Sequence, residues 1–63
     1  MSATKILEEA QNLNRVSDRL DSLADQHPKA LDALLIISRG IRDSAVLLEL
    51  LVTTKLSPAS GLQ

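Results

Sequence analysis

The chain has 63 residues, a formal net charge of −1, and neither cysteine nor any aromatic residue. This length accommodates at most one small domain, since typical domains have about 100–150 residues. The composition excludes disulfide bonds, cysteine-based zinc sites and the stacking of bases on aromatic side chains. A single histidine leaves few ways to combine a nucleophile with a base. We therefore expect no enzyme, and no metal or cofactor.

The first predicted element is an amphipathic helix over about 4–26. This stretch has no glycine or proline, and its apolar residues recur at the spacing of three and four that keeps them on one helix face. Ser2 or Thr4 can cap its start, and Pro28 ends it, because proline disfavours helical backbone in the preceding residue. The residues assigned to the hairpin core are Ile6, Leu13, Val16, Leu20, Leu23 and Leu31.

A second helix is predicted over about 28–55, since proline suits the first turn of a helix. The short connection at Gln26 and His27 makes the two helices an antiparallel hairpin over 1–56. Folding the chain at this turn pairs residues whose numbers add up to about 54, such as Leu13 and Ile41. The segment 57–63 is short, has mostly small residues and contains one proline and one glycine, which predicts a disordered C-terminal tail.

The second helix is apolar over most of its circumference, and two helices alone have no interior to cover it. Chains this small usually need disulfides, a metal or oligomerisation for stability. The predicted fold class is therefore all-α: a two-helix hairpin that dimerises into a four-helix bundle or a higher helical oligomer. The residues assigned to the oligomer interface are Leu34, Ile37, Gly40, Ile41, Ser44, Ala45, Leu47, Leu48, Leu51 and Val52.

Small and charged residues gather in the middle of the second helix. Gly40 lets another backbone approach closely, although a glycine merely tolerated in the helix is the alternative. Ion pairs at the rim of the interface are predicted for Glu9, Arg39, Arg42 and Asp43, with Arg42 of the same or a partner chain as the cation for Glu9. The alternative for the two arginines is an anion clamp. His27 is assigned a capping or solvated role in the turn.

These patterns predict a small non-catalytic module for helical oligomerisation or protein–protein interaction. Its expected partner is itself, as a homodimer or homotetramer, and the alternative partner is a helical segment of another protein. The alternative function is a small dimeric regulator that binds RNA or DNA. A net charge of −1 and the lack of a basic helix face argue against nucleic acid and membrane as partners. Without a recognisable leader or spanning segment, a cytoplasmic location is expected.

Overall fold

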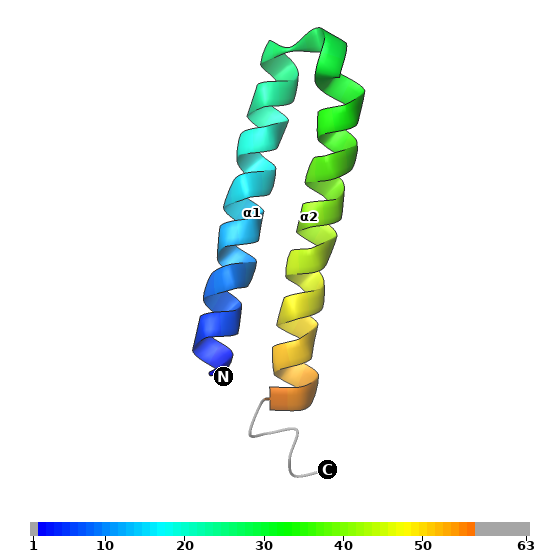
Figure 1. Cartoon of the computed structure of the whole chain (residues 1–63). Coiled ribbons are helices and arrows are strands. Elements are labelled where there is room, and N and C mark those ends of the chain that lie inside the picture. Colours follow the sequence, from blue (N-terminus) through cyan, green and yellow to red (C-terminus); the bar gives the residue numbers. More distant parts are fainter. Residues whose placement is uncertain (1, 57–63) are drawn as a thin grey trace.

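The computed structural model describes residues 2–56, which form two long helices side by side (Figure 1). Helix α1 spans Ala3–Gln26 and helix α2 spans Leu31–Leu51. A short 3-10 turn, η1, covers Pro28–Ala30, and α2 continues into a wider π-helical turn, η2, at Val52–Leu56. The all-helical hairpin predicted from the sequence is thus confirmed.

The ends of the helices follow from local chemistry. Ser2 caps α1, because its side-chain oxygen accepts a hydrogen bond from the Lys5 backbone N–H at 3.2 Å. The backbone of His27 is non-helical, with φ −132° and ψ 79°, as a residue before proline requires. The first residues after the turn form the 3-10 turn, so α2 begins at Leu31. The predicted start at residue 28 was therefore three residues early, and the predicted tail, 57–63, lies outside the described residues.

The two helices contact each other along a line of facing residues, here called the seam. The contact between Ser17 and Ser38 lies at its middle and gives its register. Their numbers add up to 55, within one residue of the register predicted from the sequence. Steps of three and four along each helix keep residues on the side of this contact, in the manner of an antiparallel coiled coil. The seam residues are Ala3, Ile6, Ala10, Leu13, Ser17, Leu20 and Ala24 of α1, and Leu31, Leu34, Ser38, Ile41, Ala45, Leu48 and Val52 of α2.

The centre of the seam is made of small side chains. Ala10, Ala24 and Ala45 are at most 1% exposed, and their size lets the helix backbones come close together. Over residues 2–56, Ser17 is the largest side chain that is fully buried. Of the larger seam residues, Ile6 and Val52 are buried at 7% exposed each, whereas others such as Leu13 and Ile41 are only half-buried. The hairpin therefore buries little apolar surface of its own.

Four sequence assignments are corrected by this seam. Val16 and Leu23, assigned to the hairpin core, are 37% and 41% exposed. Each directly precedes a buried residue of α1, so it lies about 100° around the helix from the seam. Ala45 and Val52, assigned to an interface between copies, are buried against α1 instead. They follow Ser38 by seven and fourteen residues, which returns them to the side of the seam.

Enlarging a central seam residue tests this packing. Ala10→Leu should lower the free energy of unfolding by about 1–3 kcal/mol, because the new side chain must push the helices apart or adopt a strained rotamer. Urea unfolding followed by circular dichroism at fixed protein concentration measures the change. Gln11→Leu, which adds the same side chain at an exposed position of α1, is the control. Equal stability of the two variants would contradict a tightly packed seam.

Candidate interaction surface

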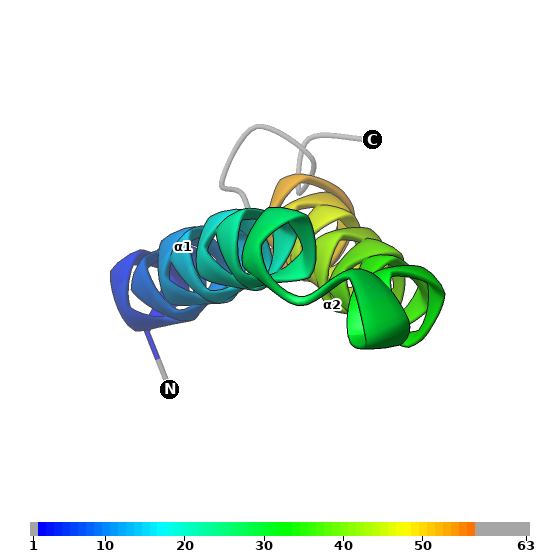
Figure 2. The same cartoon turned by 90° about the horizontal axis from the view of Figure 1, so that it is seen from above.

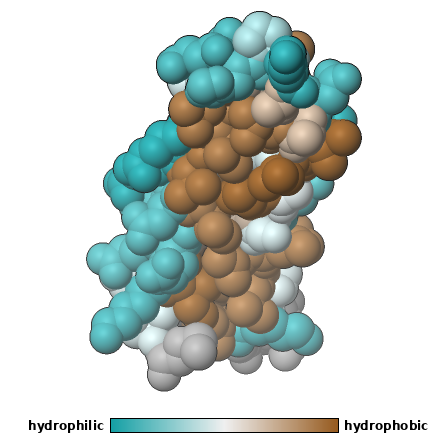
Figure 3. Space-filling model, turned by 45° about the horizontal axis from the view of Figure 1, so that its top comes forward, coloured by the Kyte–Doolittle hydropathy of each residue, from teal (hydrophilic) through white to brown (hydrophobic). Residues whose placement is uncertain are grey.

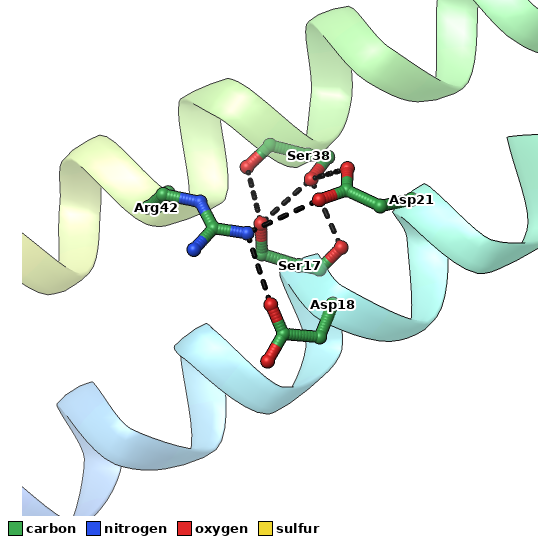
Figure 4. A network of polar contacts seen from close by, with 5 residues as sticks. All are labelled: Ser17, Asp18, Asp21, Ser38 and Arg42. Atoms are coloured by element: carbon green, nitrogen blue, oxygen red, sulfur yellow. Dashed lines mark hydrogen bonds and ion pairs between the residues drawn. The ribbon is translucent and has the colours of Figure 1, made fainter.

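Two buried serines join the helices at the middle of the seam (Figure 4). Their hydroxyl oxygens are 2.6 Å apart, and the side chains of Ser17 and Ser38 are 0% and 2% exposed. Each oxygen also lies close to the opposite backbone: Ser17 Oγ is 3.1 Å from the carbonyl of Ser38, and Ser38 Oγ is 3.0 Å from that of Ser17. Every buried polar side-chain atom of the described residues has a hydrogen-bond partner. The polar pair is thus accommodated without an unsatisfied group.

The serine pair continues into a charged cluster that reaches the surface. The Ser38 hydroxyl donates to Oδ1 of Asp21 at 2.6 Å. Arg42 Nη2 donates to Oδ2 of the same carboxylate at 3.2 Å and to Oδ1 of Asp18 at 3.1 Å. Because each hydroxyl has one proton, all these partners are satisfied when Ser17 donates to Ser38 and Ser38 donates to Asp21. The cluster therefore connects the buried seam to an exposed arginine.

The ion pair predicted between Glu9 and Arg42 does not form within the hairpin, where Arg42 pairs with Asp18 and Asp21 instead. Glu9 directly precedes the seam residue Ala10, so its side chain lies on the other side of the seam from that of Arg42. Arg39 and Asp43 form no ion pair within the described part of the chain, so Arg42 is the one member of the predicted rim set that does.

The hairpin has two broad faces of opposite character. Asp18 and Arg39, which directly follow Ser17 and Ser38, lie about 100° to one side of this contact, while Val16 and Ile37, which directly precede the two serines, lie about 100° to the other side. Because the helices are antiparallel, the residues after the two serines lie on one face of the hairpin in both helices. The residues before the serines lie together on the other face. The second face is apolar, and Figure 3 shows it as a continuous apolar surface along the molecule. This apolar face consists of Leu13, Val16, Leu20, Leu23, Leu34, Ile37, Ile41, Ser44, Leu48 and Leu51, and the exposed Glu9 lies at its edge on α1.

Nothing covers the apolar face within the described hairpin. The view from above shows both helices in a single layer, with no third helix over either broad side (Figure 2). Ile37 is 53% exposed and Leu51 is 41% exposed. At the turn, the face ends in an open hollow of about 710 Å³ lined by residues that include Leu23, His27 and Leu34. The His27 side chain makes no capping hydrogen bond and is exposed, in keeping with the solvated role.

The structure divides the predicted interface residues among three places. Leu34, Ile37, Ile41, Ser44, Leu48 and Leu51 lie on the apolar face, whereas Ala45 and Val52 lie in the seam. Gly40 and Leu47 are exposed further around α2, on the side away from α1.

The predictions missed the cluster of Ser17, Ser38, Asp18 and Asp21. One sequence pattern does indicate this cluster. Each serine lies seven residues from an alanine in the same helix, and the register places the two serines opposite each other.

Known proteins provide no template for this surface. No family model, curated protein or solved structure matches the chain. Over residues 2–56, no helix has the length and apolar character needed to cross a bilayer. That same range holds no group of three or more histidine and acidic side chains suited to a metal ion. The function must therefore be inferred from the two faces of the hairpin.

Removing one hydroxyl tests the serine cluster. Ser38→Ala should lower the free energy of unfolding by about 1 kcal/mol, because its hydrogen bonds to Ser17 and Asp21 are lost. Ser22→Ala removes an exposed hydroxyl from α1 and should leave stability unchanged or slightly higher, since alanine is the better helix former. Urea unfolding of both variants at one protein concentration measures the difference. A Ser38 variant as stable as the Ser22 variant would show that the buried cluster adds no stability.

Proposed function

We propose that the protein is a non-catalytic self-association module, in which two hairpins pack through their apolar faces into a four-helix bundle. The observation that carries this proposal is a mismatch of size. The seam buries mainly alanine and serine, whereas leucine, isoleucine and valine side chains remain on the apolar face. Large apolar patches of this kind mark association sites in soluble proteins.

The energy available from the apolar face is large relative to that of one hairpin. Fully burying one leucine or isoleucine side chain contributes about 1.5–3 kcal/mol. A core of this size seldom supplies more than about 3–5 kcal/mol by itself. Burying exposed residues such as Ile37 and Leu51, and completing the burial of Leu34 and Ile41, therefore adds as much stability as the seam provides.

A second copy of the hairpin is the simplest partner for the apolar face. Two single layers of helices that meet through apolar sides form a four-helix bundle, with the half-buried seam residues in its interior. A twofold axis pairs the same surface with itself, so no complementary surface has to exist elsewhere. Ser44 provides a small side chain where α2 of one hairpin approaches the other.

The opposite broad face does not favour binding to RNA or DNA. Of its two exposed arginines, Arg42 is held by Asp18 and Asp21, which leaves Arg39 as a single cation without an ion pair among the described residues. A phosphate backbone would therefore meet two carboxylates beside Arg42, and nucleic-acid binding depends on clustered positive charge.

A charge on the apolar face tests the proposal. At low micromolar concentration, the wild-type protein should be a dimer whose mass does not fall with salt. Ile37→Glu should weaken the dimer by about 100-fold or more, because a twofold interface buries the new carboxylate twice. Light scattering after size-exclusion chromatography measures the mass. Gln11→Glu, which adds the same charge at an exposed position outside the apolar face, is the control and should remain dimeric.

Two results would contradict the bundle. A wild-type monomer at these concentrations would show that the apolar face is not satisfied by a second copy. A dimer unaffected by Ile37→Glu would show that association uses another surface. Circular dichroism of each variant checks that the hairpin is still helical, because Ile37 is half-exposed rather than part of the seam.

A further inference from the structure

The side of α2 that faces away from α1 carries a second stripe at the spacing of a coiled coil. Steps of alternately three and four residues connect its members, the same pattern as in the seam. All of them are exposed, and Ile36 and Leu47, at 72% and 65%, are the most exposed large apolar side chains of the described chain. This outer stripe consists of Ala33, Ile36, Gly40, Asp43, Leu47 and Leu50.

Gly40 at the centre of the outer stripe has no role within the hairpin. A Cβ built there would have no neighbouring atom within 4 Å, so the packing of α1 and α2 does not require glycine. In an exposed helix interior, glycine costs about 1 kcal/mol relative to alanine. The missing side chain does, however, leave space for another helix to approach the backbone of α2.

Two charges next to Gly40 lack partners in the hairpin. Arg39 and Asp43 are four residues apart, yet neither takes part in an ion pair among the described residues. Asp43 lies within the stripe, where a second helix would cover its carboxylate, and a covered carboxylate needs a nearby cation. Arg39 lies beside the stripe, where it can reach across to a neighbouring helix.

We propose that the outer stripe is a second self-association surface, through which α2 of one copy packs antiparallel against α2 of another. In a coiled-coil register, the paired residue numbers add up to about 83. Ile36 then packs on Leu47 of the second copy, and Ala33 on its Leu50. At the centre, Gly40 faces Asp43 of the second copy and leaves room for its carboxylate. Arg39, adjacent to Gly40, supplies the cation.

The occupant is another copy of this chain because the stripe complements itself. The twofold axis repeats each apolar layer and forms two Arg39–Asp43 pairs between the copies, which fixes both register and direction. This inference rests on the proposed bundle, because the outer stripe remains exposed when the apolar faces are buried. Each dimer carries two outer stripes, and a closed tetramer forms when both stripes of one dimer pack on both stripes of another. The stripe is narrower than the apolar face, so the tetramer should form at higher concentration than the dimer.

Charge reversal at the two positions tests the stripe. Sedimentation equilibrium at low salt should show wild-type dimers at low micromolar concentration and tetramers at concentrations about a hundred times higher. Arg39→Asp and Asp43→Arg should each weaken tetramer formation by about tenfold or more, because like charges then face each other. A mixture of the two variants should form tetramers again, since each carries the charges that the other needs. Within each variant chain, the side chains at positions 39 and 43 carry like charges and still repel each other. Recovery of the tetramer in the mixture therefore reports a contact between different chains.

The outcomes separate this inference from the bundle. Wild-type dimers that never form tetramers, single variants that assemble like the wild type, or a mixture that remains dimeric would each overturn the outer stripe and leave the bundle intact. A wild-type monomer at low micromolar concentration whose assembly at high concentration is abolished by either charge reversal would support the stripe and contradict the bundle. Circular dichroism checks that both charge variants remain helical.

Discussion

The close approach of α1 and α2 at the Ser17–Ser38 contact determines most of what the molecule exposes. Hydroxyl oxygens 2.6 Å apart require helices whose facing side chains are small, and Ala10, Ala24 and Ala45 meet that requirement along the rest of the seam. A seam built this way buries Ile6 and Val52 at its open end but only half-buries its leucines and Ile41. The half-buried side chains border one broad face and are left for a second contact to bury.

The polar cluster makes the two faces different and fixes the register. Slipping α2 by three or four residues would place Leu34 or Ile41 against Ser17 and leave its hydroxyl without a partner, at a cost of about 1–3 kcal/mol. The bonds from Ser38 to Asp21 and from Arg42 to both aspartates also place the charges on one side. One face therefore carries the charged cluster, beside the exposed Leu35 and Val46, and the other face is free to associate.

The sequence predicted the features that depend on spacing and on proline. The two helices, the turn before Pro28 and the register to within one residue follow from apolar periodicity and from the restricted backbone of His27. It predicted the inward residues in part, since Ile6, Leu13, Leu20 and Leu31 lie in the seam as assigned. It did not separate the seam of α2 from its other apolar sides, because α2 is apolar around most of its circumference. Val16 and Leu23 were assigned to the core for their hydrophobicity, whereas the buried position beside Val16 belongs to a serine. At the centre of the seam, burial depends on a small side chain, which a hydrophobic pattern does not measure.

The composition of the two helices matches the different positions that they would take in an assembly. In α1, the side away from the seam is polar, and it includes a hydrogen bond of 2.8 Å between Arg15 and Asn12. In α2, the corresponding side carries Ile36 and Leu47, which a helix facing solvent would have no reason to retain. Contacts through the seam, the apolar face and the outer stripe would surround α2 with other helices while α1 remained in contact with water. An assembly with α2 at its centre and α1 at its surface therefore accounts for the difference between two helices of similar length.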